Sequence, residues 1–169
     1  GMQGRSILVI GAMVADLYLD GRISRLSREA PVLELGQAGA KVVAGGAANV
    51  VNNIATLGGK VHAVGLVGSD KSADGLRAIL AANDADVRGL IADDSRPTIS
   101  KTRIIAGGRA TVSQQIVRID RESKAPMAPA VEAELRAYIE SILPTVEGVV
   151  ISDYGCGPGR DGRRSLLVA

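Results

Sequence analysis

Two glycines separate an apolar segment from a helical pattern in residues 43–55, and this junction constrains the fold more than any other stretch. Gly45 and Gly46 have no Cβ, so they leave room for a ligand beside the backbone N–H groups that open the helix. An ordinary left-handed turn before a helix is the alternative interpretation. Asn49, in the first helical turn, has an amide that either contacts the ligand or caps the helix.

A second ligand-type residue ends the strand-like apolar run of residues 7–15. This residue, Asp16, is expected at the carboxyl end of a strand, where open α/β sheets bind their ligands. A simple turn residue is the alternative. A carboxylate, an amide and a glycine pair together suit a polyhydroxylated molecule, because each sugar hydroxyl needs both a donor and an acceptor.

Strand and helix patterns alternate along the chain, which predicts an α/β fold with a parallel sheet covered by helices. The predicted strands cover residues 7–12, 61–67, 87–91 and 148–152. The predicted helices cover residues 47–57, 69–83 and 129–143, the second opened by Ser69 or Asp70 as N-cap.

Two stretches, residues 17–35 and 98–119, instead alternate polar and apolar side chains. This pattern is typical of half-buried antiparallel strands, and a turn at Gly107–Gly108 would join the second pair. We expect a small second sheet of two or three strands, called the lid below. Its apolar face needs another surface to bury it.

Three cations of the expected lid, Lys101, Arg103 and Arg118, allow two interpretations. They either face solvent and protect a sheet edge, or they bind the phosphate of a substrate. Asp153 follows a predicted buried strand, so it lies at a carboxyl edge either as a ligand contact or as a helix N-cap.

The composition excludes several classes of function. The 169 residues suffice for one α/β domain, and three Tyr without Phe or Trp make a stacking platform for nucleic acid improbable. No apolar run has the length of a membrane span. The single cysteine, Cys156, excludes an internal disulfide and favours a reducing cytoplasm. His62 has no His or Cys partner in sequence, so no metal site is predicted.

Three motifs resemble the N-terminal half of the ribokinase-type (PfkB) carbohydrate kinases: residues 11–16, 45–49 and 65–70. Residues 24–32 and 150–155 narrow the resemblance to the D-glycero-β-D-manno-heptose 7-phosphate kinases of lipopolysaccharide core synthesis. The resemblance covers residues 7–157 and implies a partial ribokinase-like sheet whose lid covers the sugar and forms a homodimer interface. It also implies ATP and Mg²⁺ as cofactors, and sugar contacts from the residues named above: Asp16, Gly45, Gly46 and Asn49.

The nucleotide-binding half expected from this resemblance is missing. The chain has no phosphate-binding loop of the G-x-x-x-x-G-K-[ST] type, and the Gly-Ala-Gly-Asp segment that carries the catalytic aspartate in the family does not occur. Ala12 and Cys156 stand where the heptose kinases usually have Asp and Lys. We therefore expect residues 1–169 to form a single incomplete domain, with no catalytic residue and no turnover alone.

Two other interpretations remain open from the sequence. The chain is either a non-catalytic sugar-binding or dimerisation remnant of this fold, or a complete small Rossmann-type domain. The absence of a dinucleotide fingerprint counts against the second.

Overall fold

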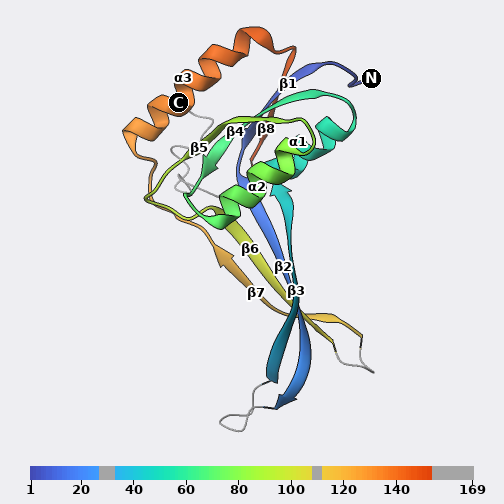
Figure 1. The fold of residues 1–169 in the computed structure, drawn as a ribbon. Helices are drawn as coiled ribbons and strands as arrows, with labels where there is room; N and C mark the ends of the chain where they lie inside the picture. The colour runs from blue at the N-terminus through green and yellow to red at the C-terminus, as the bar shows by residue number, and fades with distance from the viewer. Residues whose placement is uncertain (27–32, 108–111, 154–169) are drawn as a thin grey trace.

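The computed structural model describes residues 1–26, 33–107 and 112–153. The expected turn at Gly108, the middle of the predicted 17–35 segment and Cys156 lie outside the described residues. Figure 1 shows a helix-covered body from which a second sheet extends.

The body contains a parallel sheet of four strands in the order β5-β4-β1-β8. These strands are β1 (Ser6–Gly11), β4 (Lys60–Val67), β5 (Asp86–Ala92) and β8 (Gly148–Ser152). The apolar run of β1 is buried on both faces, as expected for a central parallel strand. All four predicted strands of this sheet are confirmed to within one residue at each end.

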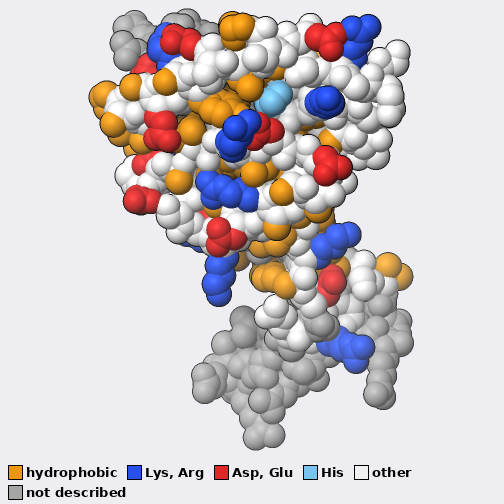
Figure 2. Space-filling model, turned by 45° about the horizontal axis from the view of Figure 1, so that its top comes forward, with side chains coloured by type: hydrophobic (Ala, Val, Ile, Leu, Met, Phe, Trp, Pro, Cys, Tyr) orange, Lys and Arg blue, Asp and Glu red, His pale blue; other side chains and the backbone are white. Residues whose placement is uncertain are grey.

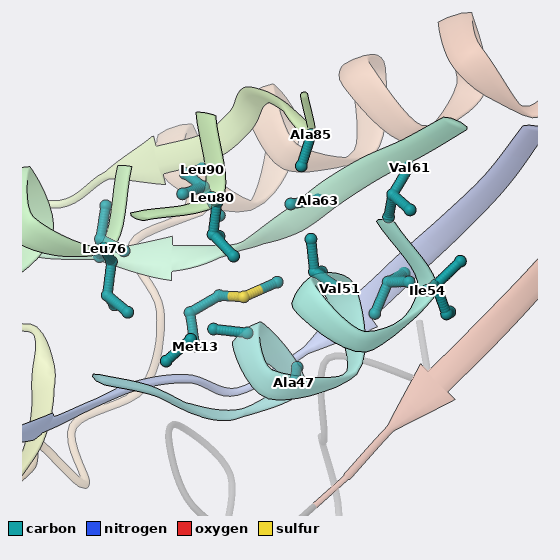
Figure 3. Packing of buried hydrophobic residues seen from close by; sticks show 14 of the residues in the cluster. Met13, Ala47, Val51, Ile54, Val61, Ala63, Leu76, Leu80, Ala85 and Leu90 are labelled. Atoms are coloured by element: carbon teal, nitrogen blue, oxygen red, sulfur yellow. The ribbon is translucent and has the colours of Figure 1, made fainter. Parts of the chain in front are cut away.

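Helices cover both faces of this sheet. On one face, α1 (Ala47–Thr56) and α2 (Lys71–Ala81) bury an aliphatic cluster that includes Met13, Val51 and Leu80 (Figure 3). On the other face, α3 (Pro129–Ile142) packs Leu135 against the sheet, and a short 3-10 helix, η1 (Leu143–Thr145), follows it. Within the described residues, no helix has the length and apolar character needed to cross a membrane.

The lid is a second sheet of four strands in the order β3-β2-β6-β7, one or two more than expected. The strands are β2 (Met13–Leu26), β3 (Leu33–Gly46), β6 (Ile99–Gly107) and β7 (Gln114–Arg121). Antiparallel pairing joins β2 to β3 and β6 to β7, but β2 and β6 pair in parallel. The lid therefore begins earlier than predicted, because β2 follows β1 after a single residue, Ala12.

The root of β6 is fastened to the body through Asp70. Its carboxylate caps α2 by accepting from the Ala73 N–H at 3.0 Å, and it accepts from the Thr98 N–H at 3.0 Å and the Thr98 hydroxyl at 2.7 Å. Burial opposes ionisation of Asp70, but the hydrogen bonds from Thr98 and Ala73 outweigh it and lower its pKa. The N-cap that the sequence left open between Ser69 and Asp70 is thus Asp70.

Candidate functional site

Asp16 lies inside a lid strand, not at the end of the parallel strand as the sequence suggested. The apolar run of residues 7–15 is divided between two sheets, because β1 ends at Gly11 and β2 begins at Met13. The side chain still lies close to the glycine pair, since Val14 pairs with Gly45 in the antiparallel β2–β3 ladder.

Gly45 provides the space that the Asp16 carboxylate occupies. A Cβ built on Gly45 would lie 2.4 Å from Asp16 Oδ2 and 3.0 Å from its Cγ, closer than real Cβ atoms approach. Any side chain at this position would therefore displace the carboxylate. The sequence predicted that Gly45 leaves room for a ligand. In the structure, the Asp16 side chain occupies this room.

The other carboxylate oxygen of Asp16 binds a lid cation. Arg103 Nη1 donates to Asp16 Oδ1 at 2.6 Å, and both side chains are largely buried, 23% and 20% exposed. The Arg103 guanidinium also lies 5.3 Å from the centre of the Tyr18 ring, in the geometry of a cation–π contact. The hydrogen bond to Asp16 raises the pKa of Arg103. Of the two sequence interpretations, simple exposure to solvent is wrong for Arg103.

The remaining two lid cations lie on the same face of the sheet as Asp16. Lys101 is directly opposite Asp16 on β2 and Asp120 on β7, and directly opposite side chains share a face. Arg118 is opposite Arg103 but is exposed, and its Nε donates to Asp120 Oδ1 at 2.9 Å. The structure thus brings Lys101 and Arg103 beside Asp16 and leaves Arg118 one strand farther out.

The helix that follows the glycine pair begins as predicted, but its first N–H is already used. Gly46 is the N-cap of α1, with φ of 56° and ψ of −133°, a conformation that L side chains rarely adopt. The Ala47 N–H donates to the Ala12 carbonyl at 2.9 Å, so this first N–H of the helix is not available to a ligand. Asn49 is exposed in the first turn and is not the helix N-cap.

Close packing around Gly11 brings the end of β8 to the same place. A Cβ on Gly11 would lie 2.1 Å from the Ser152 carbonyl oxygen and 2.9 Å from the Ala47 Cβ. Asp153, the exposed residue after Ser152, therefore lies at the same carboxyl edge as the start of α1. Its alternative as a helix N-cap involves residues outside the described part of the chain.

A second polar cluster, missed from the sequence, lies at the amino ends of the parallel strands. His62 Nδ1 is 3.1 Å from Asp86 Oδ2, and His62 Nε2 is 3.4 Å from Ser6 Oγ. Arg88 and the Tyr138 hydroxyl also donate to Asp86, and the Arg88 hydrogen bonds hold the pKa of Asp86 far below its usual range. Figure 2 shows the single histidine among acidic and basic side chains on this surface.

In the amino-end cluster, His62 lies within hydrogen-bonding distance of the Ser6 and Asp86 side chains. Within the described residues, no group of three or more His, Cys, Asp or Glu side chains is placed to hold a metal ion. Only the order of the strands reveals that Ser6, His62 and Asp86 are neighbours, because they lie near the starts of three adjacent strands that are far apart in sequence.

Comparison with known proteins agrees with this architecture. Residues 5–148 match the model of the pfkB family of carbohydrate kinases. The bifunctional protein HldE of Helicobacter pylori is 40% identical over 153 residues, which are 90% of this chain and 32% of that protein. This chain therefore spans about a third of the length of that relative.

Solved structures show the same fold at lower identity. A carbohydrate kinase from Agrobacterium tumefaciens is 17% identical with a TM-score of 0.58, over 87% of this chain and 45% of that one. Arabidopsis thaliana ribokinase, solved with ribose and ATP, is 14% identical with a TM-score of 0.55, over 89% of this chain and 45% of that one. The fold is ribokinase-like, and the chain belongs to the pfkB family of carbohydrate kinases.

Proposed function

We propose that this chain forms the sugar-binding part of a kinase that phosphorylates a sugar phosphate, with heptose 7-phosphate as substrate and its anomeric hydroxyl as phosphoryl acceptor. The Asp16 carboxylate, held between Gly45 and Arg103, is the observation that carries the proposal. A carboxylate accepts hydrogen bonds from sugar hydroxyls, and a guanidinium beside it binds the phosphate of the same molecule.

In this proposal, one set of residues binds the hydroxyl groups of the substrate and another set binds its phosphate. Asp16, Asn49 and the Gly45–Gly46 backbone hold the hydroxyl groups at the carboxyl edge of the sheet, and Asp153 borders the same edge. Lys101 and Arg103 face the anionic end, and Arg118 adds positive charge at the outer rim. Substrate hydroxyls compete with Arg103 for Asp16, so binding exchanges one charged hydrogen bond for another.

ATP and Mg²⁺ belong to a part of the kinase that this chain does not span. The described residues contain no acidic group of three that suits Mg²⁺, and the relative HldE is about three times as long. The catalytic aspartate is assigned to that same part, so this chain alone binds sugar without turnover. A cytoplasmic location is part of this proposal, and a single cysteine suits a reducing compartment.

Ligand-induced stabilisation of the purified full chain tests this function. A ligand at a hundred times its dissociation constant stabilises a protein by about 2.7 kcal/mol. We expect heptose 7-phosphate to raise the melting temperature and Mg-ATP alone to leave it unchanged. Clear ATP consumption with heptose 7-phosphate, or stabilisation by ATP alone, would contradict the assignment of the nucleotide site.

An Arg103 variant tests whether this guanidinium binds the phosphate of the substrate. Arg103→Ala is expected to weaken binding of heptose 7-phosphate about tenfold, while binding of the unphosphorylated heptose is kept, since removal of the guanidinium frees Asp16. Arg136→Ala is the matched control, because Arg136 is an exposed cation on α3, paired with Glu132. If Arg103→Ala weakens the binding of heptose 7-phosphate and of the unphosphorylated heptose equally, Arg103 does not contact the phosphate.

A second candidate function, self-association through the lid, rests on exposed apolar side chains of β7. Val117 and Ile119 lie on one face of this edge strand and are exposed in the single chain. Burial of this face against a second copy would form the homodimer that the family resemblance implies. Sedimentation of the wild-type chain and of Ile119→Asp distinguishes the cases, and a wild-type monomer at high concentration excludes the dimer.

A further inference from the structure

Tyr18 is the only aromatic residue in the four lid strands, and it lies against the cation that the proposed function assigns to the phosphate. Tyr18 on β2 is directly opposite Arg103 on β6, and the guanidinium carbon lies 5.3 Å from the ring centre. The half-buried Tyr18 shares its lid face with Asp16, two residues earlier on the same strand. The Arg103 guanidinium therefore has two attractive neighbours on this face, the Asp16 carboxylate and the Tyr18 ring.

The other members of the same cross-strand row are cations. Lys41 on β3 is opposite Tyr18, and Arg118 on β7 is opposite Arg103. One row across the four lid strands thus carries three cations and a single ring, and like charges directly opposite each other are unfavourable. Arg118 donates to Asp120 in the neighbouring row. Once Asp16 is taken by another partner, the Tyr18 ring is the neighbour in this row that attracts Arg103.

The proposed function requires Arg103 to change partners. A sugar hydroxyl that donates to Asp16 replaces the hydrogen bond from Arg103 Nη1, and the guanidinium must then stay close to the phosphate. A long side chain released from its partner regains rotamer freedom, and the loss of that freedom opposes binding. An aromatic ring restrains the guanidinium through its face, which leaves the N–H donors at the edge of the guanidinium free for phosphate oxygens.

We propose that Tyr18 is a positioning residue for Arg103, whose guanidinium stays on the Tyr18 ring when a sugar phosphate takes Asp16. Tyr18 acts through Arg103 and thereby sets the preference of the site for a phosphorylated over an unphosphorylated sugar. This inference rests on the proposed function and adds to it a residue that determines specificity.

Isothermal titration of heptose 7-phosphate and of the unphosphorylated heptose into the full chain tests this role. Tyr18→Leu is expected to weaken binding of heptose 7-phosphate about fivefold, because a half-buried cation–π contact is lost, and to leave binding of the unphosphorylated heptose unchanged. Tyr18→Phe keeps the ring and should keep the wild-type preference. In an Arg103→Ala background, Tyr18→Leu should cause no further loss, because Tyr18 acts only through Arg103.

Tyr138→Leu is the matched control, since it removes an aromatic ring that packs beneath α3 in the body. Both affinities should equal those of the wild type. Proton resonances of the Arg103 side chain, assigned by their loss in Arg103→Ala, give a second readout. Their ring-current shift should be present in the wild type and in Tyr18→Phe, absent in Tyr18→Leu, and retained when heptose 7-phosphate is bound.

The outcomes separate this inference from the proposed function. A ring-current shift that disappears when heptose 7-phosphate binds, or a Tyr18→Leu variant with the wild-type preference, overturns the positioning role alone. Equal weakening of both sugars in Tyr18→Leu also overturns it, because the ring would then support the lid in general. A wild-type chain that binds neither sugar overturns the proposed function and this inference with it.

Discussion

One carboxylate–arginine pair lies at the amino ends of the parallel sheet and another lies in the lid, and the two pairs differ in what surrounds them. At the amino ends, Asp86 receives hydrogen bonds from Arg88 and Tyr138 and lies against His62. In the lid, Asp16 has Arg103 on one oxygen and the backbone of Gly45 beside the other. Several side chains donate to Asp86, which stabilises the fold, whereas we expect the Asp16 carboxylate to exchange Arg103 for a sugar hydroxyl.

The largest expected difference between the two carboxylate–arginine pairs is in sugar binding. Asp16→Asn keeps the size of the side chain but removes the charge, so we expect about a hundredfold weaker binding of heptose 7-phosphate, which corresponds to about 2.7 kcal/mol. Isothermal titration measures the affinity. Asp86→Asn should bind as the wild type does, and a comparable loss in both variants would remove the distinction.

Gly45→Ala tests whether the space beside Asp16 matters. The new Cβ would displace the carboxylate, so about tenfold weaker sugar binding is expected, or about 1.4 kcal/mol. Gly75→Ala is the control, because the nearest atoms to a Cβ there are side-chain carbons of Val42, at 3.5 Å and beyond. Within helix α2 this change should stabilise the chain by about 0.4–1 kcal/mol in denaturant unfolding. Unchanged affinity in Gly45→Ala would show that Asp16 does not hold the sugar.

At the amino ends the expected effect is on stability. Asp86→Asn removes the negative charge and one of the two acceptor oxygens that Arg88 and His62 share, so we expect a loss of about 1–2 kcal/mol in the free energy of unfolding. Urea unfolding at neutral pH measures this. A larger loss in Asp16→Asn than in Asp86→Asn would reverse the comparison.

The pH dependence of unfolding should show the contribution of the Asp86 carboxylate to stability. The Arg88 hydrogen bonds lower the pKa of Asp86 in the folded chain, so its contribution is present above the unfolded pKa of about 3.9 and is lost as pH falls below that value. Stability of the wild type should therefore decline from about pH 5 downward. Asp86→Asn should decline less steeply, although Asp70, whose pKa is also lowered, keeps part of the slope. Parallel curves for the two proteins would contradict this account.

The smallest expected effect is that of Ser6→Ala. Its hydroxyl lies 3.4 Å from His62 Nε2, at the limit of a hydrogen bond, so the free energy of unfolding should change by no more than about 0.5 kcal/mol. A change above 1.5 kcal/mol would show that the amino-end cluster depends on this contact as well.

Sequence patterns predicted the parallel sheet closely and the lid only in part. Apolar runs such as that of β1 identify buried strands because both faces need apolar side chains. The same apolar pattern did not predict where β1 ends and β2 begins. Met13, Val14 and Ala15 are buried where the two sheets meet, so they continue the apolar run of β1. The structure places Gly45 beside Asp16, and the pairing of Asp16 with Arg103 depends on the parallel register of β2 and β6, which no local pattern encodes.

The Asp70 carboxylate binds two parts of the molecule at once, the first turn of helix α2 and the residue before lid strand β6. It caps α2 through Ala73 and holds both polar groups of Thr98, the residue before β6. Any movement of Thr98 and β6 away from the body removes the two Thr98 donors that hold the Asp70 carboxylate in its capping position at α2. Lid position and helix fraying are therefore thermodynamically linked, and amide exchange in the first turn of α2 becomes a remote reporter of lid position.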